Sequence, residues 1–192
     1  MRSAYGAKEI RIGGHLETIV VDVANVMGSR PDGWWRDRAG AAVRLHDQIV
    51  RLAASGRAIL PADARTPDGA RTPDGADTPD GARTPDGADT PDGARTPDEP
   101  GRPGFVLVLE GAAKAAAARL PTKESGTPGP VPPGEVRVVQ ARGSGDDTIV
   151  AVVRELPGRR VVVTADRELR ARCVAAGAEI LGPGWLLGLL PG

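Results

Sequence analysis

The sequence predicts an α/β fold: a single domain with a central parallel sheet flanked by helices. Short runs of β-branched and aliphatic residues alternate with longer segments in which apolar residues recur at helical spacing, and this alternation is typical of βαβ units. The aliphatic runs are nearly continuous, which indicates strands covered on both faces. A chain of 192 residues with 40% hydrophobic content is long enough for one domain with a sizeable core. Because only 3% of the residues are aromatic, that core must be aliphatic.

Five aliphatic runs are the predicted strands. They are residues 18–22, 105–110, 136–140, 160–164 and a short run at 179–181. Four segments between them are predicted helices, at 36–55, 111–120, 146–156 and 166–176. Gly56 is a plausible stop for the first helix, and Ser144 is a candidate cap of the third. The last apolar stretch, 185–190, is expected to be a packing tail.

Six copies of a hexad that reads Ala-Arg-Thr-Pro-Asp-Gly or Ala-Asp-Thr-Pro-Asp-Gly run from Ala64 to Asp98. The repeat has turn chemistry but no large apolar residue to bury, so it is expected to be disordered. Its six-residue period is too short for a solenoid, whose units need roughly 20 or more residues. The predicted organisation is an N-terminal extension at 1–15, a first domain part at 16–63, the low-complexity insertion at 64–103 and the rest of the domain at 104–192.

Charge and cysteine content place only loose limits on the function. The formal net charge is zero, but the hexad segment has four arginines and eight aspartates, so the rest of the chain is mildly basic with 21 basic and 17 acidic residues. This excess permits a polyanionic partner without requiring one. Cys173 is the one cysteine, which excludes an internal disulfide and zinc sites built from several cysteines. No signal peptide or apolar span is recognisable, so a cytoplasmic protein without a membrane partner is expected.

Acidic residues fall where the predicted strands end. Because ligands of open parallel sheets bind outside the carboxyl ends of the strands, these side chains are expected to share one site. Carboxylates brought close together repel one another and must take up protons or bind cations, and hard oxygen ligands select Mg²⁺ or Mn²⁺. The candidate residues are the acids Asp22, Glu110, Asp146, Asp147 and Asp166, together with Asn25 in the loop after the first strand.

The alternative interpretation of these acids is structural, because an aspartate at the start of a helix is most often a cap. It applies to Asp146, Asp147 and Asp166, each taken alone. Asp22 fits it less well, since a carboxylate that ends an aliphatic strand is poorly placed for solvent.

A loop rich in arginine and tryptophan is predicted at the same edge of the sheet. Trp34 and Trp35 lie beside Arg30, Arg36 and Arg38. These side chains could stack bases and contact phosphates, although tryptophans at a helix entry are more often packing anchors.

Three motifs carry a resemblance to a known superfamily. Ile19–Val26 contains a strand-terminal aspartate with an asparagine three residues later, Gly145–Ile149 is a helix start with an acidic pair, and Val163–Leu169 is a Thr-x-Asp-x-x-Leu element. In this order, and outside the insertion, the chain resembles the NYN type of the PIN-like, Rossmann-like domains. Gly145 departs from the pattern, since alanine is usual there, and Val23 stands where glycine is frequent.

The resemblance implies a Mg²⁺- or Mn²⁺-dependent ribonuclease in which Asp22, Asp146 and Asp166 are the core metal ligands and catalytic residues. It implies supporting roles for Asn25, Asp147 and Glu110. Two other functions stay open: a phosphohydrolase of nucleotides such as nucleoside triphosphates, and a catalytically silent module that binds RNA or protein. No phosphate-binding Gly-x-x-x-x-Gly-Lys loop, nucleophile elbow or dinucleotide glycine turn follows the first strand, so those enzyme classes are disfavoured.

Overall fold

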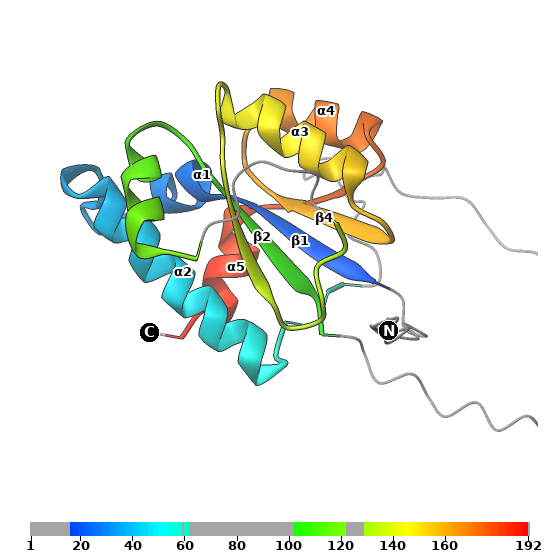
Figure 1. Cartoon of the computed structure of the whole chain (residues 1–192), viewed down its shortest axis with the longest axis horizontal. Coiled ribbons are helices and arrows are strands. Elements are labelled where there is room, and N and C mark those ends of the chain that lie inside the picture. Colours follow the sequence, from blue (N-terminus) through cyan, green and yellow to red (C-terminus); the bar gives the residue numbers. More distant parts are fainter. Residues whose placement is uncertain (1–15, 59, 62–101, 122–128, 192) are drawn as a thin grey trace, which may run out of the picture.

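The computed structural model describes residues 16–58, 60–61, 102–121 and 129–191. In these residues five parallel strands form one sheet in the order β3-β2-β1-β4-β5. Figure 1 shows β1 and β2 side by side in this sheet. The strands are β1 (Glu17–Asp22), β2 (Gly104–Leu109), β3 (Val136–Gln140), β4 (Arg159–Val163) and β5 (Glu179–Leu181). The predicted parallel sheet is confirmed, and each strand end lies within one residue of its expected place.

Side chains of alternate residues along the strands enter two separate cores. In β1, Ile19 and Val21 face one core and Val20 faces the other. All three are completely buried. Burying such a side chain stabilises the fold by about 1.5–3 kcal/mol, so strands with two apolar faces hold the layers together from both sides.

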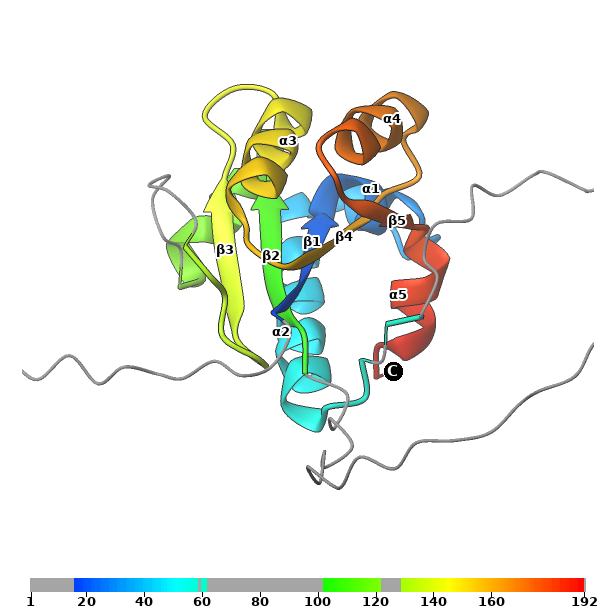
Figure 2. The same cartoon turned by 90° about the vertical axis from the view of Figure 1, so that its right-hand side faces the viewer.

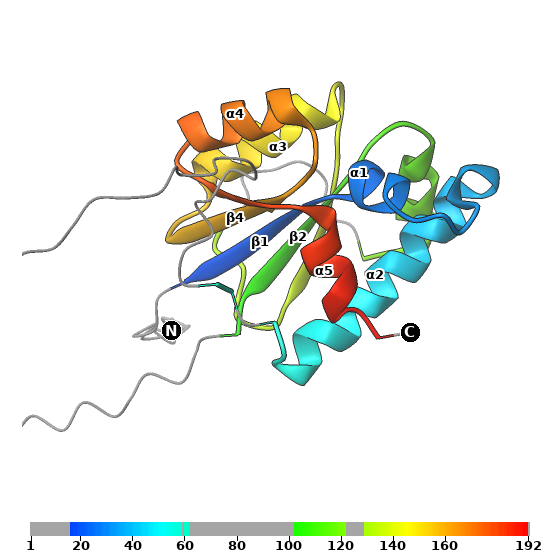
Figure 3. The ribbon, with the colours of Figure 1, turned by 180° about the vertical axis from the view of Figure 1, so that it is seen from behind.

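Helices cover both faces of the sheet. The first core contains side chains of α1 (Val23–Gly28), α2 (Arg38–Ser55), the 3₁₀ helix η2 (Gly111–Arg119) and α5 (Pro183–Leu189). The second core contains side chains of α3 (Gly145–Glu155) and α4 (Arg167–Ala175). Figures 2 and 3 show α3 and α4 together on one side of the sheet, while α2 and α5 lie on the other. The chain therefore has three layers, with the sheet in the middle.

Two short elements precede α2 and were not predicted as separate helices. The first is α1, whose six residues are too few to show helical periodicity, although Val23, Val26 and Met27 are buried. Asn25 therefore lies in a helix rather than in the expected loop. The second is a 3₁₀ turn, η1 (Trp34–Arg36), after which Asp37 caps a helix that begins at Arg38 instead of at residue 36.

The alanine-rich segment after β2 is helical as predicted, but it is a 3₁₀ helix. Its buried residues, Ala113 and Ala116, are three positions apart, which matches the three residues per turn of this helix. Small side chains tolerate the eclipsed stacking that a 3₁₀ helix imposes. The predicted stops and caps at Gly56 and Ser144 are confirmed: Gly56 ends α2 with a φ of 66°, and Ser144 accepts a hydrogen bond from the amide of Asp147.

The expected packing tail is the helix α5, in which Leu186 is completely buried. Among the described residues, none of the helices combines the length and apolar character needed to cross a bilayer. The predictions for the extension at 1–15 and for the hexad array concern residues outside the described part of the chain.

Candidate functional site

A pocket of about 450 Å³ lies at the carboxyl edge of the sheet. Four of the predicted acids line it, from the ends of β1 and β2 and from the starts of α3 and α4. In Figure 2 the arrowheads of β1 and β2 point toward the end of the molecule where α1 and α3 lie. The lining residues are Asp22, Ala24, Asn25, Gly28, Ser29, Glu110, Asp146 and Asp166.

Asp22 ends β1 and also caps α1. Its Oδ1 accepts a hydrogen bond from the amide of Asn25 at 3.0 Å, and its Oδ2 accepts one from the Thr164 hydroxyl at 3.0 Å. The Thr164 oxygen in turn accepts the amide of Asp166 at 3.2 Å. One buried hydroxyl therefore fixes the orientation of Asp22 and the position of the backbone that carries Asp166.

The pKa of Asp22 is raised above its ordinary value of 3.8, and burial is the main cause, since the residue is only 7% exposed. The two hydrogen bonds lower the pKa, while the nearby carboxylates of Glu110 and Asp146 raise it further. Its ionised form is thus disfavoured unless a positive charge is close.

Asp146 lies in the first turn of α3, and its pKa is also raised. Partial burial is the largest cause, followed by the carboxylates of Asp166 and Glu110, while Arg172 acts in the opposite direction. The two perturbed aspartates therefore belong to one electrostatic cluster of four carboxylates. Clusters of this kind are frequent at functional sites, and structural networks produce them as well.

Asp147 is placed differently from its neighbour. It does not line the pocket, and its carboxylate forms an ion pair with the Arg172 guanidinium of α4. Its side chain is 70% exposed. The structure thus gives Asp147 a bridging role between α3 and α4, outside the group of pocket carboxylates.

Glu110 reaches from the end of β2 to the start of α3. Its Oε2 accepts a hydrogen bond from the amide of Gly145 at 3.0 Å. A Cβ atom at residue 145 would lie 2.1 Å from that oxygen, so the glycine leaves the space that Glu110 fills. The glycine at residue 145 therefore has a local structural reason.

Asp166 and Asn25 hold the loop between β4 and α4 against α1. Asp166 caps α4, because its Oδ1 accepts the amide of Leu169 at 2.8 Å. The side-chain oxygen of Asn25 accepts the amide of Ala165 at 2.9 Å. Asn25 thus binds backbone through its oxygen, and that atom is already used in the folded chain.

Capping explains some of the acids and not others. Asp22 and Asp166 are helix caps, but α3 is capped by Ser144, so neither Asp146 nor Asp147 has that role.

Within the described residues no three acidic, histidine or cysteine side chains stand close enough to hold one ion in common. A cation in this pocket would contact one or two carboxylates directly and reach the others through water, which Mg²⁺ characteristically retains.

The predicted substrate-binding loop lies beside the pocket without lining it. Gly28 forms part of the pocket wall, and a Cβ atom there would be 3.7 Å from Cζ2 of Trp34. The guanidinium of Arg38 lies 5.2 Å from the centre of the Trp34 ring, and that of Arg36 lies 6.0 Å from the centre of the Trp35 ring. Arg30 follows α1, and its amide donates a hydrogen bond to the carbonyl of Met27.

Sequence reasoning assigned no role to Thr164 or Ser29. Thr164 follows a run of valines and is completely buried. The sequence signal that could have identified it is a hydroxyl residue between a buried strand and Asp166. Ser29 lines the pocket, and its hydroxyl donates a hydrogen bond to the carbonyl of Asn25 at 2.9 Å. It follows the missed helix α1, so the pattern gave no reason to place it at the site.

Comparisons of this chain with sequence models of protein families, with curated proteins and with solved structures give no match.

Proposed function

We propose that this chain is a metal-dependent ribonuclease of the PIN-like, NYN type that hydrolyses RNA phosphodiesters. One observation carries the proposal: Asp22, Glu110, Asp146 and Asp166 line the same pocket, and their mutual repulsion contributes to the raised pKa values of Asp22 and Asp146. A pocket of this kind lowers its own free energy by binding a cation, and a bound cation attracts a phosphate.

The donor atoms suit Mg²⁺ or Mn²⁺, because all four charged side chains offer hard oxygen ligands. The Asp146 carboxylate and Oδ2 of Asp166 accept no hydrogen bond from the described residues, so they are available to a cation. Oδ1 and Oδ2 of Asp22 each accept one hydrogen bond, which leaves a lone pair on each oxygen. Asp22, Asp146 and Asp166 are therefore the expected ligands, one or two of them in direct contact with the cation and the others through water. Glu110 would support them, and Asp147 is less well placed.

When bound, such a cation would supply Lewis-acid stabilisation of the phosphodiester and a lowered pKa of water. The chain itself supplies orientation. Thr164 and the amide of Asn25 fix the Asp22 carboxylate, and the amide of Leu169 fixes Asp166. Without a cation the pocket repels a phosphodiester, so substrate is expected to enter only after the positive charge is in place.

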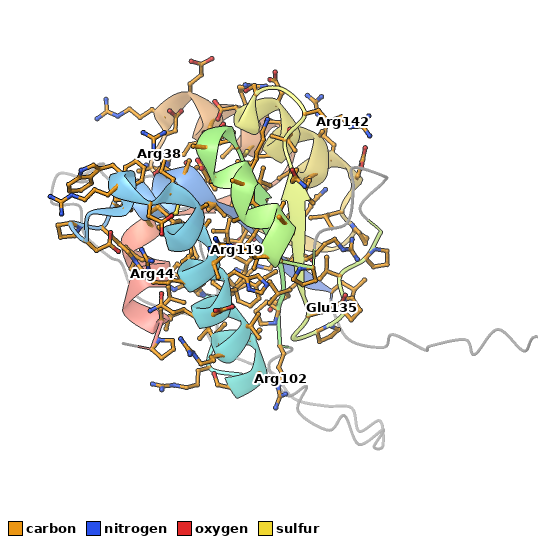
Figure 4. The ribbon with its side chains drawn as sticks, turned by 60° about the vertical axis from the view of Figure 1, so that its left-hand side comes forward. Arg38, Arg44, Arg102, Arg119, Glu135 and Arg142 are labelled. Atoms are coloured by element: carbon orange, nitrogen blue, oxygen red, sulfur yellow. The ribbon has the colours of Figure 1, made fainter. Side chains whose placement is uncertain are left out.

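Exposed arginines on one face of the molecule support a polyanionic substrate. Arg38, Arg44 and Arg119 lie on the face built by α2 and η2 (Figure 4). None of the three forms an ion pair within the described part of the chain. Unpaired cations exposed on this face would attract the phosphates of a strand that passes over it and make the affinity for that strand dependent on salt.

The decisive experiment compares cleavage of labelled RNA and hydrolysis of nucleoside triphosphates, each with Mn²⁺ and with a chelator. Asp22→Asn is expected to abolish cleavage, because it removes the central negative charge while it keeps the shape of the side chain. Glu155→Gln is the matched control, since Glu155 is an exposed acid of α3 that does not line the pocket. Intact RNA with the parent chain and Mn²⁺ would refute the proposal.

A nucleotide phosphohydrolase is the second candidate, favoured by one observation. The pocket volume of about 450 Å³ lies within the usual range of small-molecule sites, so it is large enough for a mononucleotide. Consumption of the triphosphate alone would support this function, whereas RNA binding without hydrolysis of either substrate would support a catalytically silent module.

A further inference from the structure

Trp34 and Trp35 are adjacent in the chain but lie in different environments. Trp34 is partly buried and packs against the core beneath α1 and α2. Trp35 has 55% of its surface exposed. The packing role that is usual for tryptophans at a helix entry therefore describes Trp34 and leaves Trp35 without an explanation in the fold.

The exposed ring of Trp35 is nevertheless held in place. The two indole rings meet edge to face, with centres 6.4 Å apart and planes at 86°. The turn that carries them is fixed where Oδ1 of Asp32 accepts the amide of Trp34 at 3.1 Å. A rigid aromatic side chain loses little conformational entropy when it binds a ligand, so this arrangement is suited to recognition.

The position of the two rings relative to the carboxylates is equally informative. Gly28 is part of the pocket wall and also the neighbour of Trp34, and the centre of the Trp35 ring lies 6.4 Å from that of Trp34. A strand whose phosphodiester lay among the carboxylates would therefore have both rings within reach of its neighbouring nucleotides.

We propose that Trp35 is a stacking platform for an unpaired base of the bound strand, and that Arg36 beside it contacts a phosphate. This inference rests on the proposed function, because it takes the pocket as the place of the scissile phosphodiester. Tryptophan and arginine are also frequent in protein interfaces. Here Arg36 forms no ion pair within the described residues, and the carboxylates of Asp32 and Asp37 are engaged with backbone amides. The unpaired positive charge of Arg36 beside the exposed ring favours a polyanionic ligand over a protein partner.

Tryptophan fluorescence tests the proposal without relying on cleavage. In the full chain with Trp185→Phe, the remaining fluorescence comes from Trp34 and Trp35, and it is titrated with an oligoadenylate of about five nucleotides. Parallel titrations use oligomers in which one position is abasic, both in chelator and with Mg²⁺. Stacking on Trp35 is expected to quench the fluorescence, and Trp35→Ala is expected to lower the affinity about tenfold. Val174→Ala, which truncates another exposed apolar side chain, is the control and is expected to change nothing.

The abasic oligomers distinguish stacking from a general effect on binding. In the parent chain an abasic residue at one position is expected to weaken binding as strongly as Trp35→Ala does, and in Trp35→Ala the same abasic residue is expected to cost nothing more. Equal affinities of both chains for intact oligomers, or an abasic effect of the same size in both, would overturn the proposal. Binding with this pattern but without cleavage would leave the stacking site standing and refute only the ribonuclease.

Discussion

Replacing Gly145 with alanine is expected to expel the Glu110 carboxylate from its place in the pocket. The new methyl carbon would lie 2.1 Å from Oε2 and 2.6 Å from Cδ of Glu110. Carbon and oxygen atoms need about 3.5 Å, so the carboxylate must retreat by more than about 1 Å. The hydrogen bond of 3.0 Å from the Gly145 amide is then lost.

Two opposing effects set the size of the change. A hydrogen bond to a charged group contributes about 1.5–3 kcal/mol, whereas alanine is favoured over glycine in a helix by up to about 1 kcal/mol. The free energy of unfolding is therefore expected to fall by about 0.5–3 kcal/mol, which corresponds to a loss of roughly 1–12 °C in Tm for a chain of this size. Mn²⁺ binding, measured by calorimetry, is expected to weaken by about tenfold, as when an oriented carboxylate is displaced.

Thermal denaturation in chelator, followed by circular dichroism, measures the stability effect. Gly143→Ala is the matched control, because a Cβ atom at this position of the same loop meets no atom within 4 Å. In a Glu110→Ala background the clash is absent, so Gly145→Ala is expected to be neutral or slightly stabilising. If the change costs the same with and without the Glu110 side chain, the explanation by overlap is wrong.

Three further changes test the electrostatics and the packing. In chelator Asp22→Asn is expected to stabilise the fold, because burial raises the pKa of Asp22 above 3.8 and disfavours its charge. The gain, measured by urea denaturation, should vanish below about pH 4 and grow as the pH rises above it, and a gain independent of pH would contradict this cause. Gly158→Ala is expected to destabilise by about 2 kcal/mol or more, because φ is +74° and the new Cβ would overlap the carbonyl oxygen of Leu16. Gly182→Ala, whose Cβ meets no atom within 4 Å, should be neutral. Leu186→Ala should lower the free energy of unfolding by about 2–5 kcal/mol if α5 is part of the core, and a smaller loss would mean that the helix is only loosely attached.

The sheet could be predicted because burial on both faces leaves a strong signal in the sequence. Residues 18–22 and 160–164 are aliphatic at almost every position, and such runs fit only strands covered by helices on both sides. Helices were predictable where they are long enough to show a repeating apolar face, as between Ala41 and Leu52 of α2. The six residues of α1 make too few turns for that signal, so the helix escaped prediction although it shapes the pocket.

For the site, only the grouping of residues at the ends of the strands could be predicted from the sequence. The rule that ligands bind at the carboxyl edge brought Asp22, Glu110, Asp146 and Asp166 together correctly, because it depends on topology alone. It could not separate Asp146 from Asp147, since neighbouring residues of a helix point in directions about 100° apart and their surroundings depend on packing. The same rule could not identify the buried hydroxyl of Thr164, because the role of that hydroxyl depends on the register of β1 and β4.

Among the acids of the pocket, Asp146 gives the sharpest test of function, because the fold gives it no structural role. Asp22 and Asp166 cap helices, and Glu110 accepts the first amide of α3, so each would be useful in a protein without any ligand. Asp146 accepts no hydrogen bond from the described residues, and burial and its neighbours raise its pKa. Asp146→Asn is therefore expected to increase the thermal stability in chelator and to reduce the additional stability that Mn²⁺ confers. If Mn²⁺ stabilises the variant as much as the parent chain, Asp146 is not a ligand, and the case for a metal site loses the residue that helix capping cannot explain.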